Sequence, residues 1–387
     1  MEVIRTFHPI GQGAFYSERH ICDKGEFNIV YDCGTEWRNR GKVFFNNVVK
    51  QYYNQNEIID ILFISHFDYD HVSKIEILNK SVSNIKKVVL PLLYGSDKTI
   101  LSLIFNLLGY KSISTLINNP QKFFGKDTEI IFVKPSNTYN TPINDGDIVD
   151  IDKLQGNAEI DSGTKLYSLC NPCWVFIPFN WNYKNSLNTL INSLFSNFNI
   201  TKLKNNPQYS IDEIIKDIKL PKIKNGKKFQ SSYDKLQGHI NQNSMFLYSG
   251  PDRNYEFNGE CKTLIYKDSN SNEQANYKPA CIYTGDGNLN VVKIDKIYQA
   301  YWKHVGTVQI PHHGALSSFC NDFLKSKILI CPISVGKESS YGHPSDRIIE
   351  EIALKGSCSI QITEDKWTLF SQQIIDEKAK AICEFNI

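Results

Sequence analysis

Residues 58–71 read IIDILFISHFDYDH and are the most informative stretch of this 387-residue chain. The first seven, Ile58 to Ile64, form a short apolar run of the kind found in buried strands. Four side chains that can bind metal follow within six residues: His66, Asp68, Asp70 and His71. A loop after a buried strand can direct several side chains to one point. The stretch therefore predicts a metal site at the edge of a sheet.

Histidines also gather at other predicted junctions between strand and loop. Five of the nine histidines lie in three such junctions, where His312, His313 and His343 join His66 and His71. A fourth junction, Thr284-Gly285-Asp286, ends a strand with a carboxylate. Core histidines would scatter along the chain, whereas metal ligands gather at strand ends. Asp286, His312 and His313 are therefore further candidate ligands.

The rest of the chain predicts a mixed α/β protein. Strands are expected at 27–31, 87–91, 128–134, 166–178, 244–248, 280–286, 308–311 and 328–332, and helices at 72–80, 99–116 and 346–355. The first strand should stop at Asp32-Cys33-Gly34. Gly11-Gln12-Gly13-Ala14 could be read as a phosphate-binding loop, but no clear helix follows it. A tight turn between two strands is the better interpretation.

Composition and charge exclude several classes of protein. The 43 basic residues nearly balance the 41 acidic ones, which excludes a wholly basic nucleic-acid wrapper and an acidic tail. With 41% apolar residues, the chain has the composition of a folded globular protein. The opening residues Met1–Thr6 lack the apolar region of a signal peptide, and no apolar run reaches the roughly 18 residues of a membrane span. We expect a soluble cytoplasmic protein with no membrane partner.

The ten cysteines are scattered, with one C-x-x-C pair at Cys170 and Cys173. A structural zinc needs four ligands, and the sequence offers this pair no second pair. A redox motif would need a thioredoxin-like context, which the flanking sequence lacks. We therefore expect reduced thiols, with Cys170 and Cys173 as two buried thiols beside a turn.

Residues 180–238 differ from the rest and are predicted to be a helical insertion in a single domain that spans 1–387. Asn and Lys dominate the segment, and nine lysines lie between 202 and 235. This charge is typical of a solvated helical face. It would also suit a basic lip beside a site for a polyanion such as DNA or RNA.

In chain order, the motifs resemble those of the metallo-β-lactamase fold. The pattern is most similar to the soluble hydrolase domain of bacterial competence DNA-uptake channel proteins and its free-standing relatives. The resemblance rests on a strand followed by Asp32 and on six motifs: Gly11-Gln12-Gly13, His66-x-Asp68-x-Asp70-His71, Asn241-x-x-Ser244, Thr284-Gly285-Asp286, Pro311-His312-His313-Gly314 and Tyr341-Gly342-His343-Pro344. Together they cover most of the chain, from about residue 3 to 350.

The resemblance implies an αββα sandwich, an α/β (α+β) fold, with a dinuclear metal site at one edge between its two sheets. One divalent ion would be held by Asp70, His71 and either His312 or His313. His66 and Asp68 would hold the other, and Asp286 would bridge the two. Asp32 would fix the motif loop by hydrogen bonds. Carboxylate-rich ligands of this kind accept zinc or manganese.

One departure from the family concerns the ion held by His66 and Asp68. Most of the family supplies a third histidine from a loop before the bridging aspartate. Here only His239 lies between His71 and Asp286. His239, Asn241, Asn243 or water could complete the site, which should therefore hold its ion more loosely.

Two adjacent metal ions suit displacement at phosphorus, although hydrolysis of other bonds uses the same activated water. We predict a metal-dependent phosphodiesterase, most simply a nuclease acting on DNA or RNA. The alternatives are a hydrolase of lactones, thioesters or cyclic nucleotides, and a metal-stabilised interaction subunit whose protein partners the sequence does not identify. We expect Asp70 and His343 to be catalytic, with a protonated His343 facing the scissile phosphate. A structural or a metal-binding role for His343 stays open.

Overall fold

The structure of the protein, a computed structural model, describes residues 1–23, 25–36, 42–136, 141–143, 147–181, 244–265, 277–325, 327–337, 339 and 341–377. The predicted insertion at 180–238 lies outside these residues, apart from its first two positions. His239, Asn241 and Asn243 also lie outside them.

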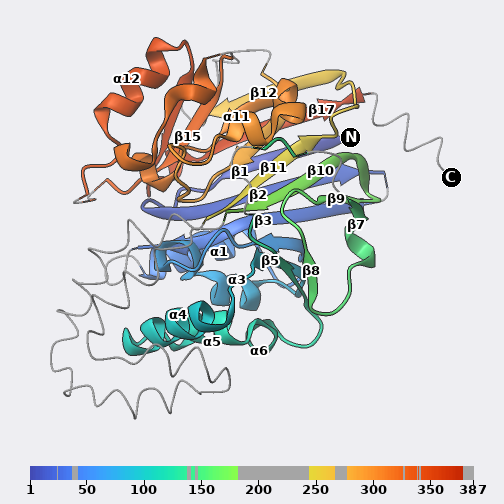
Figure 1. Ribbon diagram of the computed structural model, residues 1–387, viewed down its shortest axis with the longest axis vertical. Helices are drawn as coiled ribbons and strands as arrows, with labels where there is room; N and C mark the ends of the chain where they lie inside the picture. The colour runs from blue at the N-terminus through green and yellow to red at the C-terminus, as the bar shows by residue number, and fades with distance from the viewer. Residues whose placement is uncertain are drawn as a thin grey trace.

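Two sheets run through the centre of the molecule (Figure 1). Within the described residues, the first has nine strands in the order β12-β17-β1-β2-β3-β4-β5-β6-β8. These strands are β1 (Glu2–Phe7), β2 (Gly13–Cys22), β3 (Gly25–Thr35), β4 (Ile58–Phe63), β5 (Asn84–Pro91), β6 (Glu129–Val133), β8 (Ala158–Ile160), β12 (Gly259–Ile265) and β17 (Phe370–Asp376). The predicted turn at Gly11-Gln12-Gly13 joins β1 to β2 and is confirmed.

The second sheet has eight described strands in the order β16-β15-β14-β13-β11-β10-β9-β7. They are β7 (Ile148–Asp150), β9 (Lys165–Ser168), β10 (Asn171–Asn180), β11 (Met245–Pro251), β13 (Ala280–Tyr283), β14 (Val305–Val308), β15 (Ile330–Ser334) and β16 (Cys358–Ile362). Strands β13, β14, β15 and β16 run parallel, so the loops after their carboxyl ends share one edge of the sheet.

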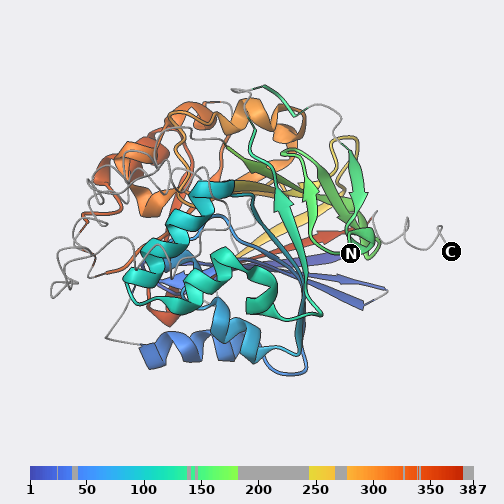
Figure 2. The ribbon, with the colours of Figure 1, turned by 60° about the horizontal axis from the view of Figure 1, so that its bottom comes forward.

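Helices cover the outer face of each sheet (Figures 1 and 2). The first sheet carries α1 (Lys42–Tyr52), α3 (Ile75–Ser81), α4 (Gly95–Leu107), α5 (Lys111–Asn118) and α6 (Pro120–Phe124), and the second carries α11 (Ile294–Ile297) and α12 (Asp346–Leu354). Three hydrophobic clusters fill the spaces between the layers: one between the sheets and one under each set of helices. The molecule is therefore an α+β sandwich with helices outside both sheets. No described helix is long and apolar enough to cross a membrane.

Strand β4 is apolar at successive positions because both of its faces are buried. Ile61 and Phe63 point into the cluster between the sheets, whereas Leu62 points into the cluster under the helices. A strand buried on both faces needs apolar side chains on both. Asp60 is the exception, and its carboxylate accepts hydrogen bonds from the Asn28 backbone at 2.7 Å and from the Lys86 ammonium at 2.7 Å.

Several predicted elements differ from the structure. The strand expected at 166–178 is divided into β9 and β10, the one at 280–286 ends at Tyr283, and the one at 308–311 lies earlier in the chain, as β14. The helix expected at 72–80 is divided into α2 (Tyr69–Val72) and α3, and the one at 99–116 is divided into α4 and α5. The second division follows Gly109, whose φ of 87° is favourable only for glycine. Strand β3 does not stop at Asp32 but continues to Thr35, with Asp32 as an irregular residue at φ 55°.

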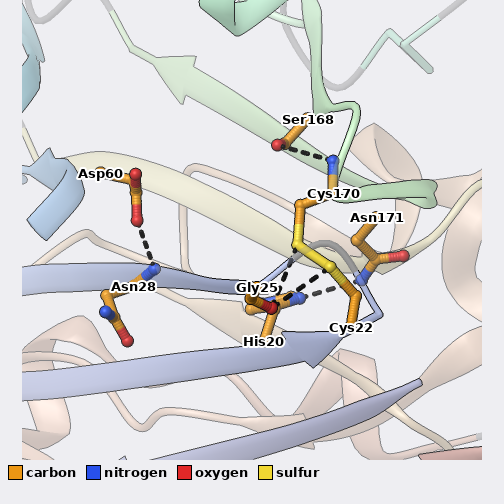
Figure 3. The surroundings of a disulfide bond; sticks show 8 residues. All are labelled: His20, Cys22, Gly25, Asn28, Asp60, Ser168, Cys170 and Asn171. Carbon is orange, nitrogen blue, oxygen red and sulfur yellow. Dashed lines mark hydrogen bonds between the residues drawn. A yellow bond between two sulfur atoms is a disulfide. The ribbon is translucent and has the colours of Figure 1, made fainter.

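The prediction of reduced thiols is wrong for Cys170. Its sulfur is bonded to that of Cys22, as Figure 3 shows. Cys22 ends β2 in the first sheet, and Cys170 lies in the turn between β9 and β10 of the second, so the bond joins the two sheets. Cys173 is outside the disulfide, and both cysteines of the C-x-x-C pair are partly exposed rather than buried. The partner of Cys170 is 148 residues away, beyond the reach of a spacing argument.

Breaking this disulfide should destabilise the fold. Closing a loop of 148 residues restricts the unfolded chain, and disulfides of this kind contribute about 2–4 kcal/mol. We expect reductant, or Cys170→Ser, to lower the free energy of unfolding by about that amount. Denaturant titration with and without reductant measures the change. Cys173→Ser is the matched control and should keep the sensitivity to reductant. An unchanged wild-type curve in reductant would contradict the stabilising role.

A buried ionic network also joins the sheets. The Glu18 carboxylate accepts hydrogen bonds from Arg5 Nε at 2.7 Å, Ser249 Oγ at 2.6 Å and the Tyr283 hydroxyl at 2.8 Å. His20 Nε2 lies 3.1 Å from the same carboxylate. Arg5 and Glu18 belong to the first sheet, and Ser249 and Tyr283 to the second. This network fixes how the sheets lie on each other, because each partner must be matched once water is excluded.

Candidate metal centre

The loop that carries His66 and Asp68 follows β4 and leads directly into the short helix α2, which begins at Tyr69. Helix α2 lies against the backbone of β3. A Cβ on Gly34 would come within 2.4 Å of the Asp70 carbonyl oxygen, so only glycine allows this approach. The contact places Asp70 and His71 at the edge between the two sheets. The loops that follow β13 and β14 lie at the same edge.

Four side chains converge at this edge and form what we call the metal cluster: Asp70, His71, Asp286 and His313. One ligand atom from each lies within 4.8 Å of the others, and all four residues are buried. His313 Nε2 is 3.0 Å from Asp70 Oδ2, and His71 Nε2 is 3.1 Å from Asp286 Oδ1. They come from α2, from the turn after β13 and from the loop after β14. Helix α2 is more than 200 residues away from the other two segments along the chain.

Two other predicted ligands, His66 and His312, border the metal cluster. His66 Nε2 lies 3.8 Å from Asp286 Oδ2, and His312 Nε2 lies 3.9 Å from the same oxygen. Asp68 is buried at the start of α2 but is not among the four clustered residues. Asp286 thus lies close to three histidines, His66, His71 and His312. Of the two adjacent histidines, His313 belongs to the metal cluster and His312 lies beside it.

The histidines are oriented through the ring nitrogen that faces away from the metal cluster. His71 Nδ1 is 2.8 Å from Asp32 Oδ2, and His313 Nδ1 is 2.9 Å from the Ser334 carbonyl oxygen. Because a carbonyl only accepts, His313 must donate from Nδ1, which leaves a lone pair on Nε2 when the ring is neutral. Hydrogen bonds of this kind orient metal-binding histidines. Asp32 also accepts a hydrogen bond from the Ser65 N–H at 2.7 Å, so it contacts both His71 and the backbone just before His66.

His66 is held in the same manner by two hydroxyl groups. Its Nδ1 lies 2.8 Å from Ser65 Oγ and 3.1 Å from Ser244 Oγ. Ser244 Oγ also accepts a hydrogen bond from the Asp286 backbone N–H at 2.9 Å, so one serine positions two candidate ligands. Ser65 and Ser244 were not predicted as site residues. Their place directly after or before an apolar run was the available signal.

The electrostatics of the metal cluster indicate how it is stabilised. Burial alone would raise the pKa of Asp286, but the charges of His71 and His312 outweigh it and hold the pKa well below its ordinary value. Burial alone would lower the pKa of His71, but Asp286 and Asp32 raise it well above the ordinary value. The two buried carboxylates thus favour positive charge at this place. A divalent cation would compensate them in the same place.

Two buried atoms at the site lack a hydrogen-bond partner within the described part of the chain: His66 Nε2 and Asp70 Oδ1. Burial, with a smaller contribution from His71, lowers the pKa of His66 to about 3, so this ring is neutral and offers a lone pair. Leaving such atoms unpaired in a protein interior is costly. Both atoms are good ligands for zinc or manganese, so the residues present fit a metal site.

Backbone strain also concentrates at the site. The described non-glycine residues with positive φ are Asp32, His312 and His313, at 55°, 50° and 54°. All three lie in or beside the metal cluster. Such conformations are unfavourable by about 1–3 kcal/mol each and persist where the surroundings impose them, commonly at functional sites.

His343 lies at the outer side of the site. Its ring centroid is 6.0 Å from that of His312 and 6.1 Å from that of the more exposed Tyr341. Burial and the neighbouring His312 and His313 lower the pKa of His343 to about 4. The ring is therefore neutral near pH 7, which disfavours the protonated form that we expected. The sequence could not show this, because the shift depends on burial and on residues 30 positions away.

Comparison with known proteins adds little to this geometry. No family model and no curated protein matches the sequence. One matching solved structure is described as the crystal structure of the metallo-beta-lactamase fold protein YhfI from Bacillus subtilis, with 8% sequence identity and a TM-score of 0.34, covering 95% of this chain and 99% of that one. A likeness of this size carries no argument. The functional reasoning below depends on the site itself.

Proposed function

We propose that the protein is a metal-dependent hydrolase of the metallo-β-lactamase superfamily that cleaves phosphodiester bonds. The observation that carries the proposal is the metal cluster, in which imidazole nitrogens and carboxylate oxygens from three distant segments face one another in a buried space. Hydrogen bonds at the remote nitrogens of His71 and His313 direct their Nε2 atoms inward. The buried His66 Nε2 and Asp70 Oδ1, which have no hydrogen-bond partner in the described part of the chain, also support a bound ion at this place.

The residues divide into two sets of ligands. Asp70, His71 and His313 would hold one divalent ion, with Asp286 shared between the two sites. His66 and Asp68 would hold the second ion, with His312 close by. When bound, such ions lower the pKa of water to about 7 and neutralise charge on the oxygens of the reacting group. Zinc and manganese both suit this mixture of nitrogen and oxygen ligands.

Two features support a phosphodiester rather than a smaller ester. His343 stands beside the metal cluster without belonging to it, and a neutral imidazole there can donate a hydrogen bond to the leaving oxygen. The Lys-rich sequence at 200–235 supports a polyanionic substrate such as DNA or RNA. Asp70 and His343 remain the proposed catalytic residues, the first through the metal and the second through the substrate.

The test is a comparison of substrates with the metal removed and restored. Chelator-treated protein would be reloaded with zinc or manganese and incubated with supercoiled, linear and single-stranded DNA, RNA, bis-p-nitrophenyl phosphate and a panel of lactones and thioesters. We expect metal-dependent cleavage of nucleic acid and of the chromogenic phosphodiester. Cleavage confined to lactones or thioesters would overturn the phosphodiester assignment. Inactivity on the whole panel, with metal bound, would favour an interaction subunit.

The same assay tests His343. His343→Ala should keep both metal ions and the melting temperature, but reduce kcat by about 10²-fold, the lower end for loss of one hydrogen-bond donor to a developing negative charge. Tyr341→Phe is the matched control, since it keeps the neighbouring ring and loses only the hydroxyl bonded to Glu36. Its kcat should stay near that of the wild type. Loss of one ion from His343→Ala would instead make His343 a ligand, and a large loss of stability would make it structural.

A further inference from the structure

A single buried glutamine connects the two ligand loops that follow β13 and β14. Gln309 is the first residue after β14, three positions before His312, and is 3% exposed. Its side-chain oxygen Oε1 accepts hydrogen bonds from the backbone N–H groups of Thr284 and Gly285, at 2.8 Å and 2.9 Å. These residues directly precede Asp286. The side chain therefore reaches from one ligand loop to the other.

The amide nitrogen of Gln309 completes the connection. Nε2 donates to the Gly285 carbonyl oxygen at 3.1 Å and to the Ile310 carbonyl oxygen at 2.8 Å. The Thr284 hydroxyl donates to the Gln309 backbone carbonyl oxygen at 2.8 Å and lies 3.0 Å from Oε1. The four hydrogen bonds of the Gln309 amide lie in the buried interior. Few other side chains could satisfy so many groups, because the amide provides both an acceptor and two donors.

These hydrogen bonds join two loops that both contain residues with positive φ. Gly285 has a φ of 55°, and a Cβ there would lie 2.9 Å from Ser65 Oγ. His312 and His313, in the other loop, also have positive φ. The His312 N–H donates to the Gly285 carbonyl oxygen at 3.2 Å, the same oxygen that receives Gln309 Nε2. The loop of His312 and His313 would relax to a more favourable conformation if nothing held it.

The structure assigns Gln309 the role of a positioning residue that sets the geometry of Asp286 and His313 together. It touches neither the metal ligand atoms nor the space between them, so it acts through the two loops. The assignment rests on the proposed metal site, because positioning has meaning only where a cation is bound. It predicts that both ligands move when one distant amide is lost. Partners of this kind typically change metal affinity by 10–100-fold.

Cobalt binding to the metal-free full-length protein tests the assignment without relying on activity. In Gln309→Met, a side chain of similar length loses all four amide hydrogen bonds, and we expect a 10–100-fold weaker affinity for Co²⁺ and an altered visible spectrum of the bound ion. Gln372→Met is the matched control. Gln372 is equally buried and accepts from Arg5 and Thr307, but it contacts no ligand loop. Its variant should lose stability yet keep the wild-type affinity and spectrum.

Several outcomes decide the matter. Folded Gln309→Met with the wild-type cobalt affinity and spectrum would overturn the assignment, and so would an equal loss of affinity in Gln372→Met. If Gln309→Met does not fold, Gln309→Glu decides, because it keeps the acceptor for Thr284 and Gly285 but loses the donors. Wild-type affinity in Gln309→Glu would then overturn the assignment. Wild-type protein that binds no cobalt would overturn the proposed function along with it, which distinguishes the two failures.

Discussion

Asp286→Asn should remain folded but retain neither divalent ion, and hydrolysis should fall by roughly 10³-fold, since a metal centre contributes several kcal/mol to transition-state stabilisation. Asp286 is the one carboxylate close to both sets of histidines in the described part of the chain: its oxygens lie 3.1 Å from His71, 3.8 Å from His66 and 3.9 Å from His312. The variant keeps the shape of the side chain but removes the charge that both ions would share.

Asp68→Asn provides the contrast. Asp68 lies outside the metal cluster, so its variant should lose mainly the ion held with His66 and keep the other. Elemental analysis after dialysis gives the stoichiometry, and circular dichroism shows whether each variant is folded. Two ions retained by Asp286→Asn would show that it does not bridge. If the wild-type protein holds no tightly bound transition metal, the proposed metal site is contradicted.

Glu18→Ala should destabilise the fold by about 3–5 kcal/mol, the usual cost of removing one partner from a buried ion pair. The variant would leave the Arg5 guanidinium, which is fully buried, without the carboxylate that now lies 2.7 Å from it. It would also leave the Ser249 and Tyr283 hydroxyls without their acceptor. Because these groups belong to both sheets, the loss should weaken the packing of the sandwich as a whole.

Glu26→Ala is the matched control for Glu18→Ala. Glu26 lies on the adjacent strand β3 and is half exposed, with its carboxylate 3.7 Å from Arg19. An exposed pair of this kind is worth only about 0–1 kcal/mol. Denaturant titration of both variants measures the difference. Equal effects would show that the Glu18 network contributes no more than a surface pair.

The same network makes the stability depend on pH. Burial alone would raise the pKa of Glu18, but the charge of Arg5 and the bonds from His20 and Ser249 outweigh it and lower the pKa. A carboxyl group with a lowered pKa in the folded state stabilises the protein fully above its unfolded pKa of about 4.5 and loses this contribution as pH falls. Wild-type stability should therefore decline more steeply below pH 4.5 than that of Glu18→Gln, in unfolding curves measured across that range.

Much of the sandwich follows from local patterns in the chain. The apolar run before Ser65 predicts β4, because a strand buried on both faces requires apolar side chains at successive positions. The abrupt change to His66, Asp68, Asp70 and His71 then marks the end of that strand as a site. Asp286 and His313 could be predicted similarly, since each comes within three residues of the end of a strand-like run. These features can be predicted locally, because a buried strand requires apolar residues and a ligand site requires His or Asp at particular positions in the sequence.

Other features depend on residues that only folding brings together. The bond between Cys22 and Cys170 joins two sheets, so no local spacing near either cysteine predicts it. The choice of His313 for the metal cluster depends on Asp70, and the low pKa of His343 depends on the burial of its ring beside His312. Gln309 carries no signal in the sequence, because its function comes from backbone groups of Thr284 and Gly285 in another loop. Hydrogen bonds and charges act across a few ångströms in space, whatever the separation along the chain, and the packing of the two sheets sets those distances here.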